Sequence, residues 1–213
     1  DAERELKKAQ DKRVNKKTLN KLAKKISYAS QKLSKTFLKD PPENDLKKLS
    51  KLFYNKEYKE LISISKILLK QFPESVSVFN ILGTTYHLTN EYDLSLEFYG
   101  KAIKIMPEWP DLHLNLGNVS KDLGHLDKAM SSYNEALKLN PSFSKSYYNI
   151  ALILKECGNI EKSIKFYKEY LSLEKDCAIG HNNLGNAYFE LEKYEKALFF
   201  YEKSLSIDNN YFE

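Results

Sequence analysis

Apolar residues fall into stripes with helical spacing, and two such stripes occur in every 34 residues of most of the chain. In residues 76–109 the first stripe contains Phe79, Leu82, Tyr86 and Leu88, and the second contains Leu94, Phe98, Tyr99, Ala102, Ile103 and Met106. Intervals of three and four residues place such side chains on one face of an amphipathic helix. The polar stretch Asn90–Glu91 separates the two stripes, and Pro107 ends the second. The pattern predicts two helices joined by a tight turn.

The same pattern recurs in phase along the chain. Steps of 34 residues connect Tyr99, Tyr133, Tyr167 and Tyr201, then Pro73, Pro107 and Pro141, and then Gly83, Gly117 and Gly185, with Ala151 in the remaining place. A repeat of this length indicates stacked units, none of which buries its apolar face alone. We therefore expect an all-α fold, an α-solenoid of antiparallel helix pairs.

Repeat boundaries follow from these ladders. Four repeats keep the pattern, at 76–109, 110–143, 144–177 and 178–211, and a degenerate repeat at 42–75 keeps Tyr58 and Pro73 in phase. Terminal repeats are often atypical because one side faces solvent. We assign 41–213 to the repeat array and 1–40 to a separate extension.

Small residues have two expected roles in each repeat. Gly83, Gly117, Ala151 and Gly185 are expected to let the two helices approach closely. Asn90, Gly124 and Gly158 occupy the place between the helices. Glycine and asparagine tolerate the left-handed conformation that ends a helix, so we expect that conformation there.

These repeats resemble the tetratricopeptide repeat family. That pattern has an aromatic, Leu-Gly and Tyr in its first helix, and Ala, an aromatic, Ala and a closing Pro in its second. Residues 76–109 supply Phe79, Leu82–Gly83, Tyr86, Tyr99, Ala102 and Pro107, and the next three repeats supply several of the same places. The resemblance implies a right-handed superhelix whose first helices line a concave groove, where the family binds peptides or partner helices.

Positive charge is concentrated in the N-terminal extension. The whole chain has a net charge of +5, but residues 1–40 contain 13 Lys and Arg against 5 Asp and Glu. An apolar stripe from Leu19 to Phe37 predicts a basic amphipathic helix there, and Asp40-Pro41-Pro42 ends it. Such a helix either caps the first repeat or binds nucleic acid or an anionic membrane surface. We favour capping, because the stripe is regular and arginines are few.

The remaining composition restricts the function classes. No apolar run is long enough to span a membrane, and Cys157 and Cys177 are interpreted as buried or half-buried free thiols, which favours a cytoplasmic location. The four histidines lack partners at metal-binding spacing, so we expect no metal, no cofactor and no catalytic residue. The last apolar helix has no following repeat to cover it, which suggests either that the polypeptide continues or that this face self-associates.

Candidate binding residues lie on one face of the first helices. The fifth, sixth, ninth and twelfth places of a repeat share that face, because they are three, four and seven residues apart. These places contain Asn80, Asn115, Asn118, Lys121, Asn149, Lys155, Asn182, Asn183 and Asn186. An asparagine amide both donates and accepts, as a peptide bond does, so such a ladder can hold an extended chain by its backbone. It resembles the asparagine ladder in the superhelical repeats of O-linked N-acetylglucosamine transferases. The alternative is that these amides bond within the scaffold.

The expected function is a non-catalytic scaffold that binds a protein or peptide partner in the groove. One alternative is that the repeats recruit substrates for a larger enzyme, such as a glycosyl-, sulfo- or methyltransferase or an oxygenase. A weaker alternative is nucleic-acid binding through the basic extension, and the sequence does not name the partner.

Overall fold

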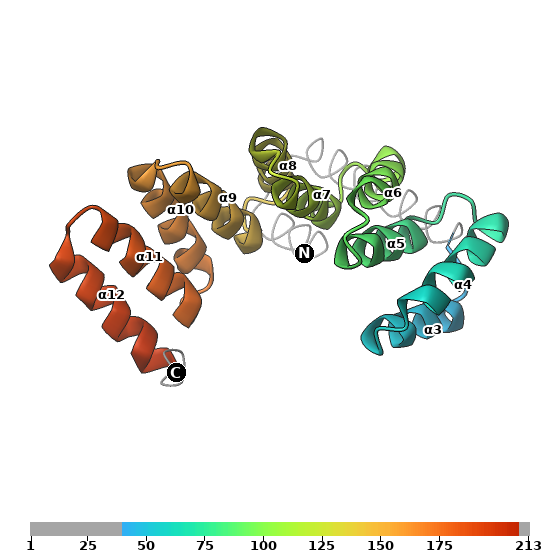
Figure 1. Ribbon diagram of the computed structural model, residues 1–213, viewed down its shortest axis with the longest axis horizontal. Coiled ribbons are helices and arrows are strands. Elements are labelled where there is room, and N and C mark those ends of the chain that lie inside the picture. The colour runs from blue at the N-terminus through green and yellow to red at the C-terminus, as the bar shows by residue number, and fades with distance from the viewer. Residues whose placement is uncertain (1–39, 209–213) are drawn as a thin grey trace, which may run out of the picture. The chain divides into compact units, whose positions relative to one another are not determined.

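The computed structural model describes residues 40–208, and every regular element in that range is an α-helix. The helices are α3 (Glu43–Tyr54), α4 (Tyr58–Gln71), α5 (Val76–Leu88), α6 (Tyr92–Ile105), α7 (Pro110–Asp122), α8 (Leu126–Leu139), α9 (Ser144–Glu156), α10 (Ile160–Leu173), α11 (Ala178–Glu190) and α12 (Tyr194–Ile207) (Figure 1). Two helices fall within each expected repeat, so the all-α solenoid is confirmed. The basic extension lies, apart from Asp40, outside the described residues.

The chain divides into two compact units, Asp1–Leu82 and Gly83–Glu213. The right-handed superhelix stays a prediction.

In the N-terminal unit, α3 and α4 pack together through buried leucines, Leu49, Leu52, Leu61 and Leu68. Asp40 is bound to the start of α5. Its carboxylate accepts hydrogen bonds from the hydroxyls of Ser75 and Ser77, the latter at 2.6 Å, and from the Ser77 backbone N–H. Ser75 in turn accepts from the Val78 N–H at 3.1 Å, as an N-cap residue does.

In the C-terminal unit, each helix pair packs internally and against the next pair. Contacts join α7 to α8, α9 to α10 and α11 to α12 within repeats, and α6 to α7, α8 to α9 and α10 to α11 between repeats. One buried cluster, which includes Tyr133 and Ile150, contains residues of two consecutive repeats. A second buried cluster, which includes Tyr167 and Leu184, contains residues of the repeats at 144–177 and 178–211. Neighbouring repeats therefore complete one another's cores.

Close helix approach depends on the glycine and tyrosine ladders together. A Cβ atom added to Gly83, Gly117 or Gly185 would lie 2.8, 2.5 or 2.7 Å from the ring of the tyrosine sixteen residues later. That is closer than two nonbonded carbons approach, so an alanine at any of these three places would require the tyrosine ring to shift. The expectation for these three glycines is confirmed.

The turn inside each repeat uses a left-handed residue, also on a ladder of 34 residues. Asn90, Gly124 and Gly158 have φ angles of 61°, 74° and 74°, which confirms the prediction. Lys56 and Glu192 occupy the same place in the first and last repeats, with φ angles of 60° and 56°. Residues other than glycine and asparagine adopt this region at a cost of about 1–2 kcal/mol, so the turns at Lys56 and Glu192 are strained.

The interpretation of the cysteines needs one correction. Cys177 is half-buried, and the Tyr170 hydroxyl lies 3.1 Å from its sulfur. Cys157 is exposed instead, because it follows the end of α9 at the turn. Both are free thiols.

Candidate functional site

The candidate site is the polar face of α7, α9 and α11 in the C-terminal unit. Asn115, Asn118, Lys121, Asn149, Lys155, Asn182, Asn183 and Asn186 lie on these helices, and all are half-buried. Asn80 is half-buried on the part of α5 that belongs to the N-terminal unit. A half-buried polar side chain can be held by the scaffold and still meet a ligand, so the hydrogen bonds of each amide matter.

Asparagines in the ninth place of a repeat are held by the tyrosine ladder. The hydroxyls of Tyr133 and Tyr201 donate to Oδ1 of Asn118 and Asn186, both at 2.8 Å. In the repeat at 76–109 the ninth residue is Thr84, and its hydroxyl lies 2.8 Å from the Tyr99 hydroxyl. The ladder thus fixes one end of each amide by a bond within the repeat.

The tyrosines that make these bonds stay protonated. Burial raises the pKa of Tyr99, and the hydrogen bond with Thr84 lowers it by a smaller amount, so the resulting pKa is about 12. Burial also raises the pKa of Tyr133 and Tyr201 above the usual value for tyrosine. Their hydroxyls therefore remain donors at any physiological pH.

Two asparagines in the sixth place, Asn149 and Asn183, are held by the neighbouring repeat instead. Asn149 donates from Nδ2 to Oδ1 of Asn118 at 3.1 Å. Asn183 donates from Nδ2 to the Tyr148 hydroxyl at 3.0 Å. The structure brings Asn118 and Asn149 into direct contact, across the α7 and α9 helices of successive repeats.

These bonds leave opposite ends of the two kinds of amide available. Asn118 and Asn186 use only Oδ1, and their Nδ2 donors have no partner among the described residues. Asn149 and Asn183 use Nδ2, and within residues 40–208 their Oδ1 acceptors have no partner. On α11 an open acceptor and an open donor therefore lie three residues apart on one face.

The lysines of the candidate set behave differently. Lys155 forms an ion pair with Glu190 of the next repeat, with 2.9 Å between Nζ and Oε1. Lys121 has only a distant contact of 4.0 Å with its neighbour Asp122. His87 makes an equivalent link to Asp122, 2.7 Å from Nε2 to Oδ2. An ion pair and a histidine–aspartate hydrogen bond thus connect successive repeats.

Sequence reasoning did not identify a further set of hydrogen bonds, made from the fourth place of the repeats at 110–143, 144–177 and 178–211. His113 and His181 donate from Nε2 to the carbonyls of Pro107 and Lys175, at 2.7 and 2.9 Å, and the Tyr147 hydroxyl donates to the Pro141 carbonyl at 3.1 Å. Each bond ties a first helix to the loop that follows the preceding second helix. The recurrence of His113 and His181 at one place was the signal in the sequence.

Neither a metal site nor a membrane span is found in the part of the chain that the structure describes. No group of three His, Cys, Asp or Glu side chains there could hold a metal ion. No helix among the same residues has the length and apolar character needed to cross a bilayer.

Helix pairs stacked in sequence order, with a polar face on the first helix of each pair, define an α-solenoid repeat protein. Tetratricopeptide repeat models match residues 76–108, 110–143, 132–165 and 178–211, which together cover more than half of the chain. The chain belongs to the tetratricopeptide repeat family.

Solved structures with the same fold include MamA, which is 20% identical with a TM-score of 0.69 over 76% of this chain and 94% of that one. The structure of YrrB, described as a tetratricopeptide repeat protein with an unusual peptide-binding site, is 19% identical with a TM-score of 0.64 over 80% and 88%. That of PilF from Pseudomonas aeruginosa is 15% identical with a TM-score of 0.71 over 77% and 75%. Identities this low establish a shared fold alone. No curated protein sequence matches the chain.

Proposed function

We propose that the chain is a protein-interaction scaffold, and that the polar face of α7, α9 and α11 binds an extended peptide by its backbone. The family and the fold support a role in protein interaction in general. The finer proposal rests on the open amide donors of Asn118 and Asn186 and the open amide acceptors of Asn149 and Asn183, which lie on the same face.

An extended peptide presents a carbonyl and an N–H from every residue that is not proline. Open Nδ2 donors at Asn118 and Asn186 suit peptide carbonyls, and open Oδ1 acceptors at Asn149 and Asn183 suit peptide N–H groups. The scaffold bonds fix the orientation of each amide, so little side-chain entropy remains to be lost on binding. Intramolecular bonding and ligand binding are therefore compatible at these residues.

A binding experiment tests this proposal. Twelve-residue peptides selected on the whole protein from a randomised display library are measured by fluorescence anisotropy. The double variant Asn149→Ala/Asn183→Ala removes two open acceptors and is expected to weaken binding about 5- to 150-fold, from roughly 0.5–1.5 kcal/mol per hydrogen bond. The control, Asn134→Ala, removes an exposed amide on α8 whose Nδ2 already bonds to the Met130 carbonyl, and should leave binding unchanged.

Two outcomes would sink the proposal. One is an unchanged affinity in the double variant while its circular dichroism matches the parent chain. The other is a peptide whose backbone N–H groups can be methylated one by one without loss of affinity, since backbone recognition requires those donors.

The remaining interpretations stay predictions. An array that recruits substrates for a larger enzyme is tested by the full reading frame of the gene. Nucleic-acid binding concerns residues 12–39, which lie outside the described range, and is tested by the salt dependence of binding to a duplex oligonucleotide. The absence of catalysis, the cytoplasmic location and self-association are likewise predictions.

A further inference from the structure

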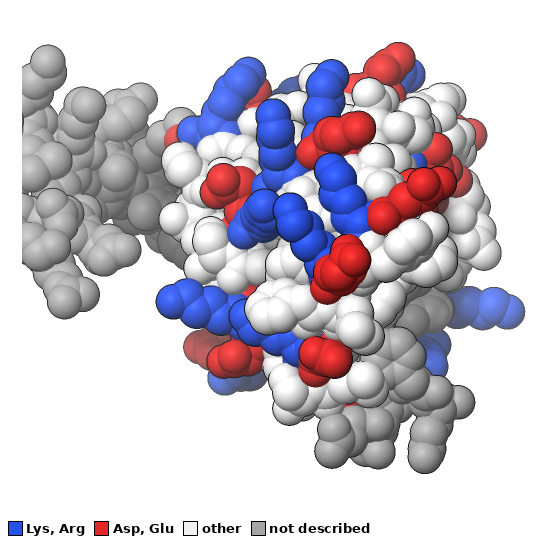
Figure 2. Space-filling model, turned by 90° about the vertical axis from the view of Figure 1, so that its left-hand side faces the viewer, with Lys and Arg blue, Asp and Glu red and all other residues white. Residues whose placement is uncertain are grey.

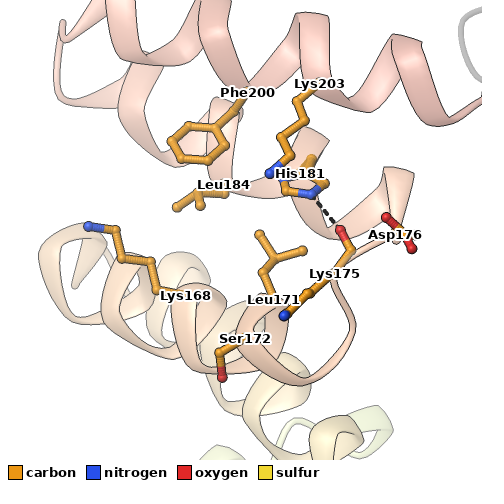
Figure 3. A pocket seen from close by; sticks show the side chains of 9 residues that line it. All are labelled: Lys168, Leu171, Ser172, Lys175, Asp176, His181, Leu184, Phe200 and Lys203. Atoms are coloured by element: carbon orange, nitrogen blue, oxygen red, sulfur yellow. Dashed lines mark hydrogen bonds between the residues drawn. The ribbon is translucent and has the colours of Figure 1, made fainter.

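A basic pocket lies between α10, α11 and α12, on residues other than those of the amide ladder. It has a volume of about 410 Å³ and is lined by Lys168, Leu171, Ser172, Lys175, Asp176, His181, Leu184, Phe200 and Lys203 (Figure 3). His181 and Asn183 are two residues apart on α11, or about 200° around the helix, so they face different sides. The pocket is therefore separate from the proposed peptide groove.

The inner part of the pocket is apolar. Leu171 and Leu184 belong to the buried cluster of the last two repeats, and Phe200 packs against that cluster. The Phe200 ring stacks on His181 with 6.0 Å between centroids, and on Tyr188 with 5.5 Å. This surface suits a bulky apolar side chain and gives no reason for a small hydrated ion to bind there.

The rim of the pocket carries an excess of positive charge. Lys168, Lys175 and Lys203 line it against the single carboxylate of Asp176. All three lysines are exposed, and none forms an ion pair with another described residue. The face that carries the last repeat shows lysine side chains gathered together with acidic ones around them (Figure 2). Lysines around an apolar floor favour a ligand with acidic groups beside an apolar one.

His181 adds a hydrogen-bond acceptor that the protein leaves unsatisfied. The side chain is only 3% exposed, and its Nε2 lies 2.9 Å from the Lys175 carbonyl (Figure 3). Because a carbonyl only accepts, Nε2 must carry the proton in the neutral ring, which leaves Nδ1 as an acceptor. Nδ1 is buried with no partner among the described residues. Buried acceptors normally have a donor, so the pocket favours an occupant that brings an N–H group.

We propose that this pocket is a second binding site, and that it takes an acidic peptide segment with one bulky apolar side chain. The apolar side chain packs against Leu171, Leu184 and Phe200, while flanking carboxylates bind Lys168, Lys175 and Lys203. A backbone N–H of the same segment supplies the donor that His181 lacks; because Nδ1 is covered in the unbound protein, the side chains over it must move aside when the segment binds. A peptide combines all three features, whereas free phosphate supplies the negative charge alone.

The probe for this site is an acetylated and amidated pentapeptide with a central leucine and two acidic residues on each side. Its binding to the whole protein is followed by nuclear magnetic resonance of the histidine ring nitrogens. We expect the His181 Nδ1 resonance to shift as Nδ1 begins to accept a hydrogen bond. We also expect a pentapeptide with asparagine and glutamine in place of the acidic residues to bind at least about tenfold more weakly.

Matched variants locate the site. Lys168→Gln/Lys203→Gln removes two rim charges and should weaken binding about tenfold, whereas Lys162→Gln/Lys193→Gln removes the same charge from exposed positions outside the pocket and should have little effect. All four lysines are exposed, so both variants should fold. The Asn149→Ala/Asn183→Ala variant should bind the probe normally, which distinguishes this site from the proposed groove.

Three results would overturn the proposal. The first is equal loss of affinity in the two lysine variants, which would mean nonspecific attraction of charge. The second is an unchanged His181 resonance when the peptide binds. The third is equal affinity for inorganic phosphate, which would make the pocket a simple anion site.

Discussion

The hydroxyl of Tyr133 offers a direct test of how the tyrosine ladder stabilises the repeats. It donates to Asn118 at 2.8 Å, and the tyrosine is fully buried. Tyr133→Phe removes this bond but leaves Asn118 Oδ1 still accepting from Asn149. A hydrogen bond of this kind contributes about 0.5–1.5 kcal/mol, so we expect the free energy of unfolding to fall by about 1 kcal/mol.

Tyr167 is the matched opposite case within the same ladder. It is also fully buried, but Leu152 occupies the ninth place of its repeat, and its hydroxyl has no partner among the described residues. Burying an unpaired hydroxyl costs about 1–3 kcal/mol. Tyr167→Phe should therefore leave stability unchanged or raise it by about 1 kcal/mol, although the substitution is chemically identical.

The assay is urea unfolding followed by circular dichroism, with hydrogen exchange to assign each change to its repeat, because repeat arrays need not unfold in one step. The informative quantity is the difference between the two variants, expected to be about 1–2 kcal/mol. Equal destabilisation by Tyr133→Phe and Tyr167→Phe would refute the reasoning, since it would show that the bond to the ninth residue is not what distinguishes them.

Three further predictions follow from the backbone and from His181. Gly117→Ala should lower the free energy of unfolding by about 1–3 kcal/mol, because its Cβ would lie 2.5 Å from the Tyr133 ring. Gly100→Ala, with open space around it on α6, should raise the free energy of unfolding by about 0.5–1 kcal/mol. Thermal unfolding of both variants checks this. Glu192→Gly relieves a positive φ of 56° and should raise the unfolding midpoint in urea, and a lower midpoint would count against strain at that turn. Burial lowers the pKa of His181, so its contribution to stability is complete above the unfolded value of about 6.5 and is lost as the pH falls through the folded value. Between pH 7.5 and pH 5.5 the urea midpoint of unfolding should therefore fall more in the parent chain than in the His181→Phe variant. An equal fall in the two proteins would contradict this.

Much of the fold could be predicted from the sequence because its ladders reflect local packing rules. Glycine beneath a tyrosine ring and glycine or asparagine at a left-handed turn are each dictated by the space or backbone angle at one residue, and the spacing then repeats them. Lys56 and Glu192 were missed because neither residue type signals a left-handed turn, and the surrounding helices impose the angle.

The candidate site was less predictable for a physical reason. The sequence places Asn118 and Asn149 on the polar face, but which end of each amide stays open depends on the distance to a tyrosine hydroxyl or to the next repeat. The pocket around His181 could not be predicted either, since it depends on how Phe200 of α12 packs across α11. Such contacts arise between elements, and residue spacing alone does not encode them.

The leucine at position 152 has a mechanical consequence. In the repeats at 76–109, 110–143 and 178–211, a side-chain hydrogen bond connects the tyrosine of the second helix to the ninth residue, on the first helix. The helices α9 and α10 are joined without such a bond. When two helices slide past each other, a hydrogen bond between them is lengthened, whereas apolar contacts are only exchanged for other apolar contacts. Among the four regular repeats we therefore expect the α9–α10 pair to slide more easily than the α7–α8 and α11–α12 pairs when the array adjusts to a long partner.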